Sequence, residues 1–300
     1  MNGLSLALLL PLSAIIIQGA HTAVARMSVG YISPEAISFY RWAIAVVMLA
    51  PIMGPSFIRE WNLIRQNLLR IAILGVLGMV AYQVAVYFAV QTTTATNAAI
   101  LGSLAPLLTV GFSALLLRER PGPLVLTGCI VSFIGVLLLI EHGDLSAILT
   151  HRIVMGDILV LGGVTLYALY STLLRRWKMP LSALALFYAQ ALTAFVVLTP
   201  WPFIGTFSPI DATNWPLVAV AAIGGSFAAP LLWMLAVRRV GAVVTAIFSN
   251  LSPLVTIGIA VTWMGEHVEL YHVLGGLLTL GGVILAQAEL LRRAPKPVTA

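Results

Sequence analysis

Residues 99–111 read AILGSLAPLLTVG and residues 246–258 read AIFSNLSPLVTIG, so the chain repeats one motif 147 positions further on. The same offset superimposes other residues of the two copies, namely Glu119 on Glu266, Gly128 on Gly275 and Gly135 on Gly282. We therefore expect two equivalent halves, the first over residues 1–145 and the second over residues 150–292.

The composition indicates that lipid is the solvent of this chain. Charged residues make up 9% of the 300 residues and apolar residues 60%, and the mean hydropathy is +1.04. A soluble domain of this length needs far more polar surface. The apolar runs are continuous and long enough to cross a bilayer, which favours helices over barrel strands. We expect ten spans, near residues 4–23, 36–53, 70–90, 95–117, 123–141, 153–174, 181–200, 213–237, 241–263 and 270–290.

The cations are divided unequally between the two ends of these expected spans. With ten spans, Arg26 and Arg152 fall on one side, Arg41 lies within a span, and every other Lys and Arg falls on the opposite side. By the positive-inside rule both termini are cytoplasmic. Membrane topology thus accounts for the net charge of +6, and we expect no nucleic-acid partner.

An odd number of spans per half has a consequence for function. The second copy must cross the bilayer in the opposite direction to the first, and many secondary transporters build two alternative gates from such inverted repeats. No phosphate-binding loop of the form G-x-x-x-x-G-K-[ST] occurs, which excludes an ATP-driven pump. No H-x-x-x-H motif or paired intramembrane acid indicates an enzyme, and no ring of like charges indicates a channel. We expect a carrier without catalytic residues, cofactor or metal.

Two of the expected spans carry small residues along one face. Gly128, Ser132 and Gly135 line the fifth span, and the tenth span has the matching series Gly275, Thr279, Gly282 and Ala286. Small residues allow helix backbones to approach closely within a membrane. The stripes predict packing within one chain or, alternatively, the seam of a homodimer.

These motifs resemble those of a known family. Pro34 and Arg41 open the second span, while Pro106 and Glu119 followed by Gly128 and Gly135 recur 147 positions later. In this arrangement the sequence resembles the paired EamA domains of the drug/metabolite transporter superfamily, over nearly all of its length. Within that superfamily it is most similar to the YddG-type bacterial exporters of aromatic and other neutral amino acids.

The resemblance implies ten transmembrane helices, arranged as two inverted five-helix repeats around a central cavity, in the bacterial inner membrane. It also implies export of small metabolites by alternating access. The alternative within transport is movement of lipid-linked or cationic drug-like substrates. One departure from the symmetry is Arg41, because the corresponding region of the second half reads Phe187-Tyr-Ala-Gln190.

Polar and aromatic residues near the middle of the spans are the candidates for binding a small-molecule substrate. Buried polar groups in a membrane require partners, so they face one another, water or cargo. The alternative for each of them is interhelical hydrogen bonding. The candidate substrate-binding residues are Gln18, His21, Arg41, Trp42, Tyr82, Tyr87, Ser103, Tyr167, Gln190 and Asn250.

Arg41 is the most informative of these residues because a charged side chain two turns inside a span is a functional hypothesis by default. A guanidinium group is suited to holding a substrate carboxylate. The alternatives are a side chain that extends to the membrane surface, or an ion pair with Glu35, Glu141 or Asp157. His21, at a similar depth, is a candidate to share or gate the same site.

Proline and acidic residues complete the expectation. Pro106 and Pro253 interrupt equivalent spans and are predicted to act as paired hinges, the alternative being static kinks. No Asp or Glu lies near mid-membrane, which predicts a facilitator or exchanger in place of a proton-driven pump. Any proton coupling must then use His21, Glu141 or Asp157.

Overall fold

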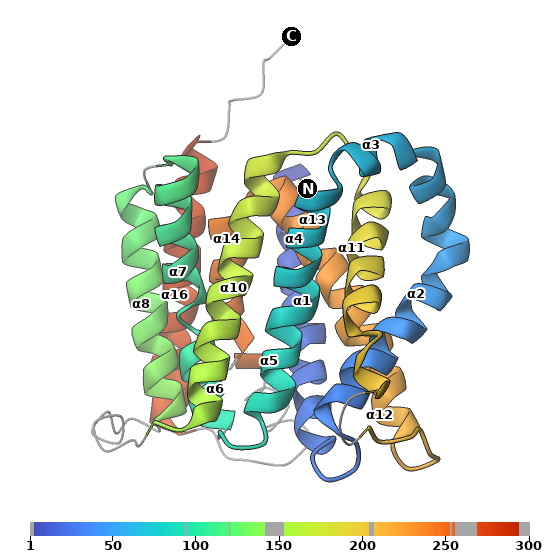
Figure 1. Cartoon of the computed structure of the whole chain (residues 1–300). Helices are drawn as coiled ribbons and strands as arrows, with labels where there is room; N and C mark the ends of the chain where they lie inside the picture. The colour runs from blue at the N-terminus through green and yellow to red at the C-terminus, as the bar shows by residue number, and fades with distance from the viewer. Residues whose placement is uncertain are drawn as a thin grey trace.

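The protein is a bundle of helices, and the computed structural model describes residues 3–93, 95–119, 121–141, 153–203, 207–252, 254–255 and 269–293 (Figure 1). Every regular element within these ranges is helical, as the sequence predicts. The first half contains α1 (Gly3–Met27), α2 (Pro34–Arg59), α3 (Trp61–Gln66), α4 (Leu68–Leu74), η1 (Gly75–Ala81), α5 (Tyr82–Ala89), α6 (Ala95–Gly102), α7 (Ala105–Phe112), η2 (Ser113–Leu117) and α8 (Pro123–Ile140). The second half contains α10 (Met155–Trp177), α11 (Ala183–Leu198), η3 (Trp201–Phe203), α12 (Trp215–Val220), η4 (Ala221–Ala228), α13 (Ala229–Val240), α14 (Ala242–Ile247), η5 (Phe248–Leu251) and α16 (Leu270–Arg293).

Seven helical stretches in the described part of the chain are long and apolar enough to cross a membrane. They are Pro34–Arg59, Leu68–Ala89, Ile100–Leu117, Pro123–Ile140, Met155–Trp177, Ala183–Phe203 and Trp215–Val240. Three shorter apolar stretches, Leu8–Gly19, Ala242–Leu251 and Leu270–Ala286, lie within the first, ninth and tenth expected spans. The fold is therefore that of an integral membrane protein, while a total of ten crossings stays a prediction.

Two equivalent spans, the third and the eighth, change helix type partway along. The third span runs through α4, the π-helical segment η1 and α5, and the eighth runs through α12, the π-helical segment η4 and α13. The repeat offset carries residues 75–81 onto 222–228, so the two π segments coincide to within one residue. π-helical turns within α-helices are rare and are frequent at functional sites. The internal repeat thus extends to irregularities of the backbone.

The small-residue stripes of α8 and α16 face each other within one chain. At Gly135, an added Cβ would lie 2.8 Å from the carbonyl oxygen of Gly275, which leaves no room for a larger residue. Thr279 also packs against Gly135, and it donates its hydroxyl hydrogen bond to Gly275 O at 2.8 Å along its own helix. Small residues therefore bring the two backbones together where lipid provides little hydrophobic drive.

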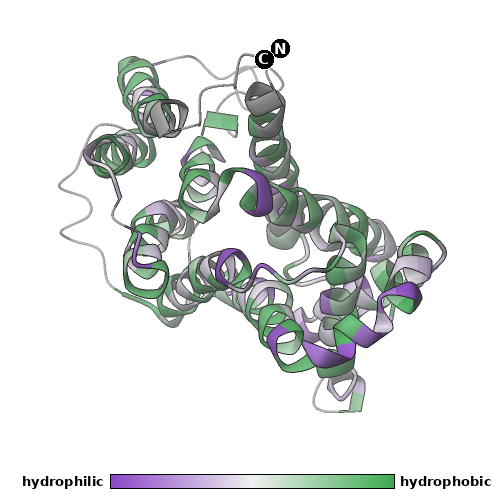
Figure 2. Ribbon diagram, turned by 90° about the horizontal axis from the view of Figure 1, so that it is seen from above, coloured by the Kyte–Doolittle hydropathy of each residue, from purple (hydrophilic) through white to green (hydrophobic). Residues whose placement is uncertain are grey.

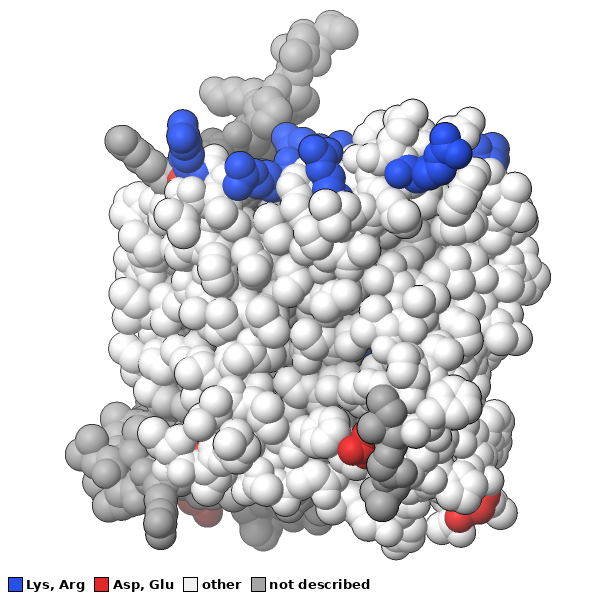
Figure 3. Space-filling model, in the orientation of Figure 1, with Lys and Arg blue, Asp and Glu red and all other residues white. Residues whose placement is uncertain are grey.

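The two ends of the bundle differ in charge. The described Lys and Arg side chains, apart from Arg41, gather along one end, which we call the cationic end (Figure 3). α1 begins and α16 ends at this same end (Figure 1). Seen from above, hydrophobic residues dominate the helices, and hydrophilic residues form short stretches in turns and on parts of some helices (Figure 2). The distribution agrees with the side assignment made from the sequence.

Candidate functional site

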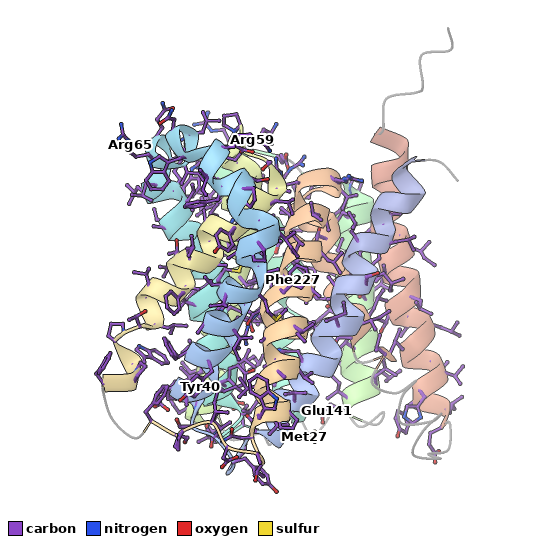
Figure 4. The ribbon with its side chains drawn as sticks, turned by 90° about the vertical axis from the view of Figure 1, so that its right-hand side faces the viewer. Met27, Tyr40, Arg59, Arg65, Glu141 and Phe227 are labelled. Atoms are coloured by element: carbon purple, nitrogen blue, oxygen red, sulfur yellow. The ribbon has the colours of Figure 1, made fainter. Side chains whose placement is uncertain are left out.

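Arg41 lies in the third turn of α2, and the start of that helix is well defined. The Ser33 hydroxyl accepts a hydrogen bond from the Ala36 N–H, and Pro34 occupies the first turn. Two turns further on, the Arg41 side chain points into the protein and is fully buried, with 0% of its surface exposed. Figure 4 shows Tyr40 and Phe227, the sequence neighbours of Arg41 and Ser226, between Arg59 at one end and Glu141 near the other.

The partners of the Arg41 guanidinium are all neutral. Nε donates to Ser226 Oγ at 2.6 Å and Nη2 donates to Gly225 O at 3.0 Å, both in η4. Nη1 donates to Gln83 Oε1 at 3.3 Å and to His21 Nε2 at 3.1 Å. We call Arg41, His21, Gln83, Tyr87, Gly225 and Ser226 the arginine site.

Both structural alternatives for Arg41 considered from the sequence are wrong. The side chain does not extend to the membrane surface, because it is completely buried. It also forms no ion pair with Glu35, Glu141 or Asp157, and no other carboxylate of the described residues pairs with it. Asp157 instead accepts hydrogen bonds from the Thr93 hydroxyl and from the Val154 N–H, at 3.0 Å for the latter, and so caps α10.

His21 and Tyr87 enclose the cation from another side. The Tyr87 hydroxyl lies 2.9 Å from His21 Nε2, and the centroid of the Tyr87 ring is 5.5 Å from the Arg41 Cζ. Because guanidinium N–H groups only donate, His21 Nε2 is the acceptor and its proton is assigned to Nδ1. That Nδ1 is buried without a hydrogen-bond partner among the described residues. The arginine site therefore has a spare buried donor beside a positive charge.

Arg41 and Trp42, which are consecutive in α2, form hydrogen bonds with the π segments of the two halves. Arg41 donates to Gly225 O in η4, and the Trp42 Nε1–H donates to Met79 O in η1 at 3.0 Å. Trp42 is 1% exposed, and its ring centroid lies 5.6 Å from the Arg41 Cζ. Backbone carbonyls of the irregular segments therefore serve as acceptors for these two side chains.

A second group of side chains, which we call the aromatic cluster, comprises Tyr82, Tyr167, Tyr170 and Trp233. The Tyr167 ring lies 4.6 Å from Tyr82, 5.3 Å from Tyr170 and 5.2 Å from Trp233, centroid to centroid. Trp233 Nε1–H donates to Ser171 Oγ at 3.0 Å, whereas the buried Tyr170 hydroxyl has no partner among the described residues. Tyr82 of this cluster and Gln83 of the arginine site are consecutive residues of α5.

The remaining predicted residues lie apart from this constellation or have local partners. Ser103, in the turn after α6, donates to Ile100 O of that helix at 2.6 Å, and Asn250 Nδ2 donates to Ser132 Oγ at 2.8 Å across to α8. Gln190 is 0% exposed, and its amide contacts Met234 Sδ at 3.7 Å while Oε1 lacks a partner among the described residues. Gln18 lies one turn before His21 on α1.

The predicted hinges have different outcomes. Pro106 lies in the first turn of α7, directly after the turn at Ser103 and Leu104 that separates α6 from α7. The break in this span is therefore present where the sequence predicts it. Pro253 lies outside the described residues, although the 3₁₀ turn η5 precedes it at the place equivalent to the break before Pro106.

The candidate residues chosen from the sequence lack three members of the arginine site, Gln83, Gly225 and Ser226. Gln83 is spaced one turn from Tyr87 on α5, so both side chains share the face that meets Arg41. Gly225 contributes only a backbone oxygen, which no side-chain pattern reveals. The Gly224-Gly225-Ser226 run in the middle of an apolar span was the available signal. Among the described residues, no three His, Cys, Asp or Glu side chains come together as a metal site would require.

Comparison with protein families decides the relationship. The profile of the EamA-like transporter family matches residues 5–141 and, a second time, residues 154–287. The chain belongs to the EamA-like transporter family. The arginine site joins the two EamA matches, because His21, Arg41 and Gln83 come from the first and Gly225 and Ser226 from the second.

The EamA relatives are described as transporters. "Uncharacterized transporter YyaM" of Bacillus subtilis (strain 168) is 30% identical over 290 residues, covering 94% of this chain and 92% of that protein. The "Probable terminal-alkyne amino-acid exporter" of Streptantibioticus cattleyicolor is 28% identical over 262 residues, covering 86% of this chain and 85% of that protein. A solved crystal structure aligns with a TM-score of 0.72 at 20% identity, covering 97% of this chain and 99% of that chain, and shares the fold. The protein is thus a membrane transporter of the EamA family.

Proposed function

We propose that this EamA protein exports small zwitterionic metabolites, aromatic and other neutral amino acids above all, by alternating access. The observation that carries the proposal is the fully buried Arg41 guanidinium, whose partners are all neutral. A buried charge without a counter-charge is costly, by several kcal/mol even after relaxation. A substrate carboxylate supplies that counter-charge and accepts two parallel N–H bonds from a guanidinium group.

The neighbouring groups support a carboxylate over other ligands. The unpartnered His21 Nδ1–H and the Ser226 hydroxyl are additional donors beside the cation. A cationic drug-like substrate is disfavoured because it would meet an uncompensated positive charge. The positive site thus selects an acidic group on the cargo.

The aromatic cluster supports an apolar side chain on the same cargo. Tyr82 and Tyr167 are only partly buried, and flat rings at such spacing stack on phenyl or indole groups. The spare oxygens of Tyr170 and Gln190 are available to an ammonium or indole N–H. The name of the Streptantibioticus relative, an amino-acid exporter, is consistent with this substrate class.

Alternating access follows from the proposed inverted architecture. We infer ten crossings in two oppositely oriented five-helix repeats, in a bacterial inner membrane, with the cationic end in the cytoplasm. One chain is proposed as the functional unit, since the stripes of α8 and α16 face each other within it. Because we place no acid at mid-membrane, transport is expected to be facilitated diffusion or exchange.

The test is uptake into liposomes that contain the purified protein. Labelled tryptophan and labelled alanine are compared with and without unlabelled substrate inside, before and after the proton gradient is collapsed. We expect saturable exchange that survives the collapse, is abolished by Arg41→Ala and is not restored by Arg41→Lys, which lacks the planar fork. Arg65→Ala, which removes an exposed cation at the cationic end, is the control and leaves exchange unchanged.

Two outcomes would overturn the proposal. Exchange that is equal in Arg41→Ala and the native protein would remove the carboxylate role of Arg41. Absence of transport for both amino acids, in protein that still unfolds cooperatively, would favour lipid-linked substrates over amino acids.

A further inference from the structure

A cavity of about 240 Å³ lies at the cationic end, away from the arginine site. The C-terminal end of α10, the loop that follows it, α11 and the C-terminal end of α13 form its walls. Its lining divides into an apolar part and a cationic part. The lining residues are Leu174, Arg175, Lys178, Met179, Leu186, Val237 and Arg238.

The cationic part carries three positive charges and no carboxylate. Arg238 Nη2 donates to Leu181 O at 2.9 Å, which fixes this guanidinium beside the cavity and leaves its other N–H groups available. The Lys178 ammonium makes no hydrogen bond or ion pair with any described residue. Lys178 also ends α10 in the left-handed backbone region, with φ of 35°, an uncommon conformation for a residue with a side chain.

Arg175 connects this cavity with the other half of the protein. Its Nη2 lies 3.4 Å from the Glu119 carboxylate, which belongs to the first repeat. The Arg175 side chain also lines a second cavity of about 340 Å³ that Glu119 borders. A ligand that accepts hydrogen bonds from Arg175 therefore competes with the Arg175–Glu119 ion pair between the two halves.

The apolar part distinguishes a lipid from a free ion. Leu174, Met179, Leu186 and Val237 are all 6% exposed or less and give the cavity an apolar floor beside the cations. Inorganic phosphate needs only the cations, whereas a phospholipid also offers a glycerol and the first acyl carbons to such a floor. The cavity lies at the ends of membrane-length helices, which is the depth of lipid headgroups.

We propose that this cavity binds the phosphate headgroup of an anionic phospholipid, with Arg175, Lys178 and Arg238 as its ligands. Basic pockets between transmembrane helices are the form in which membrane proteins hold such headgroups. The bound phosphate takes hydrogen bonds of Arg175 that otherwise go to Glu119. Lipid occupancy is thereby linked to the contact between the two repeats.

The proposal is tested on the full chain purified in detergent, without transport as the readout. The midpoint of thermal unfolding is measured after addition of phosphatidylglycerol, phosphatidylcholine or inorganic phosphate, and retained lipid is counted by native mass spectrometry. We expect phosphatidylglycerol to raise the midpoint by ~2–4 °C more than phosphatidylcholine, as ~1 kcal/mol of preferential binding does for a protein of this size.

Two double variants make the test specific. Lys178→Gln with Arg238→Gln removes two cations from the cavity and abolishes the difference between the two lipids. Arg176→Gln with Arg239→Gln removes two cations from the neighbouring positions outside the cavity and preserves the difference. Because each variant is compared with itself in two lipids, a general loss of stability does not affect the result.

Three results would overturn the proposal. An equal response to both lipids in the native protein would show that the headgroup charge is not recognised. A loss of the difference in both double variants would indicate diffuse surface charge. An equal midpoint shift with inorganic phosphate alone would identify a site for small anions in place of a lipid.

Discussion

Gly78 and Gly225 occupy equivalent positions in the two repeats, and each lies against an aromatic ring carried by the opposite half. Gly78, in η1, faces the ring of Tyr170 from α10, and Gly225, in η4, faces the imidazole of His21 from α1. At Gly78 an added Cβ would lie 2.7 Å from the Tyr170 ring. Each π segment thus receives a ring from the first helix of the other repeat.

Gly225→Ala is expected to abolish exchange and to lower the unfolding midpoint. A Cβ at this position overlaps the imidazole of His21, so the ring must leave both Arg41 and Tyr87. Overpacking of this kind costs about 1–3 kcal/mol. Gly162→Ala on α10, where an added Cβ meets nothing within 4 Å, is the matched control for the measurements of thermal unfolding and exchange. Normal exchange by Gly225→Ala would contradict a role for His21 in holding Arg41.

Tyr87→Phe tests the hydroxyl without removing the ring over Arg41. The variant loses the 2.9 Å hydrogen bond to His21 Nε2 and keeps the cation–π contact. A neutral hydrogen bond contributes ~1 kcal/mol, so we expect the half-saturation concentration for exchange to rise about fivefold while folding is retained. Concentration dependence of tryptophan exchange provides the measurement. An unchanged value would place the Tyr87 hydroxyl outside the recognition of cargo.

Tyr167→Leu tests whether the aromatic cluster reads the side chain of the cargo. Tyr167 is in contact with three other rings, and an aromatic pair contributes ~0.5–1.5 kcal/mol beyond its buried area. We expect the affinity for tryptophan to fall by up to about tenfold and that for alanine to change by less than about twofold. Competition of both amino acids against one labelled substrate measures the ratio directly. An equal decrease for both would assign Tyr167 a structural role.

Asp157→Ala is expected to lower stability and to leave the dependence on the proton gradient unchanged. Asp157 accepts from Thr93 and from the Val154 N–H, so it ties the start of α10 to the turn that follows α5. Loss of such a cap costs about 0.5–2 kcal/mol. Glu35→Ala is the control, since it also removes an acid from the first turn of a helix but breaks no hydrogen bond of a described side chain. A change in proton dependence would instead identify Asp157 as a coupling residue.

The sequence predicted the helical fold and the positions of the seven membrane-length helices because both follow from local composition. Apolar length and the charge asymmetry of turns are properties of contiguous residues, and the membrane enforces them directly. The break before Pro106 was also predictable, since proline removes a backbone donor. The π-helical type of residues 75–81 and 221–228 was not predictable from the sequence, because it depends on contacts with other helices.

The constellation around Arg41 was predicted only in part for a related reason. Its depth in a span marked it as functional, but its partners are separated by up to 185 positions along the chain. Nothing in the local pattern could distinguish Ser226 from Ser103, although the first accepts a hydrogen bond from Arg41 and the second donates to the carbonyl of Ile100, three residues before it. Which of the two serines contacts Arg41 depends on how the helices pack against one another.

The neutral surroundings of Arg41 determine how the membrane potential acts on the proposed carrier. Arginine stays protonated at every pH that a cell reaches, so the cation remains in the protein throughout the cycle. A zwitterionic cargo adds no net charge, and its passage is then insensitive to voltage. A cargo with one negative charge instead experiences about 2.3 kcal/mol per 100 mV. In a cell with a negative interior, this force drives such an anion outward without any proton or sodium ion.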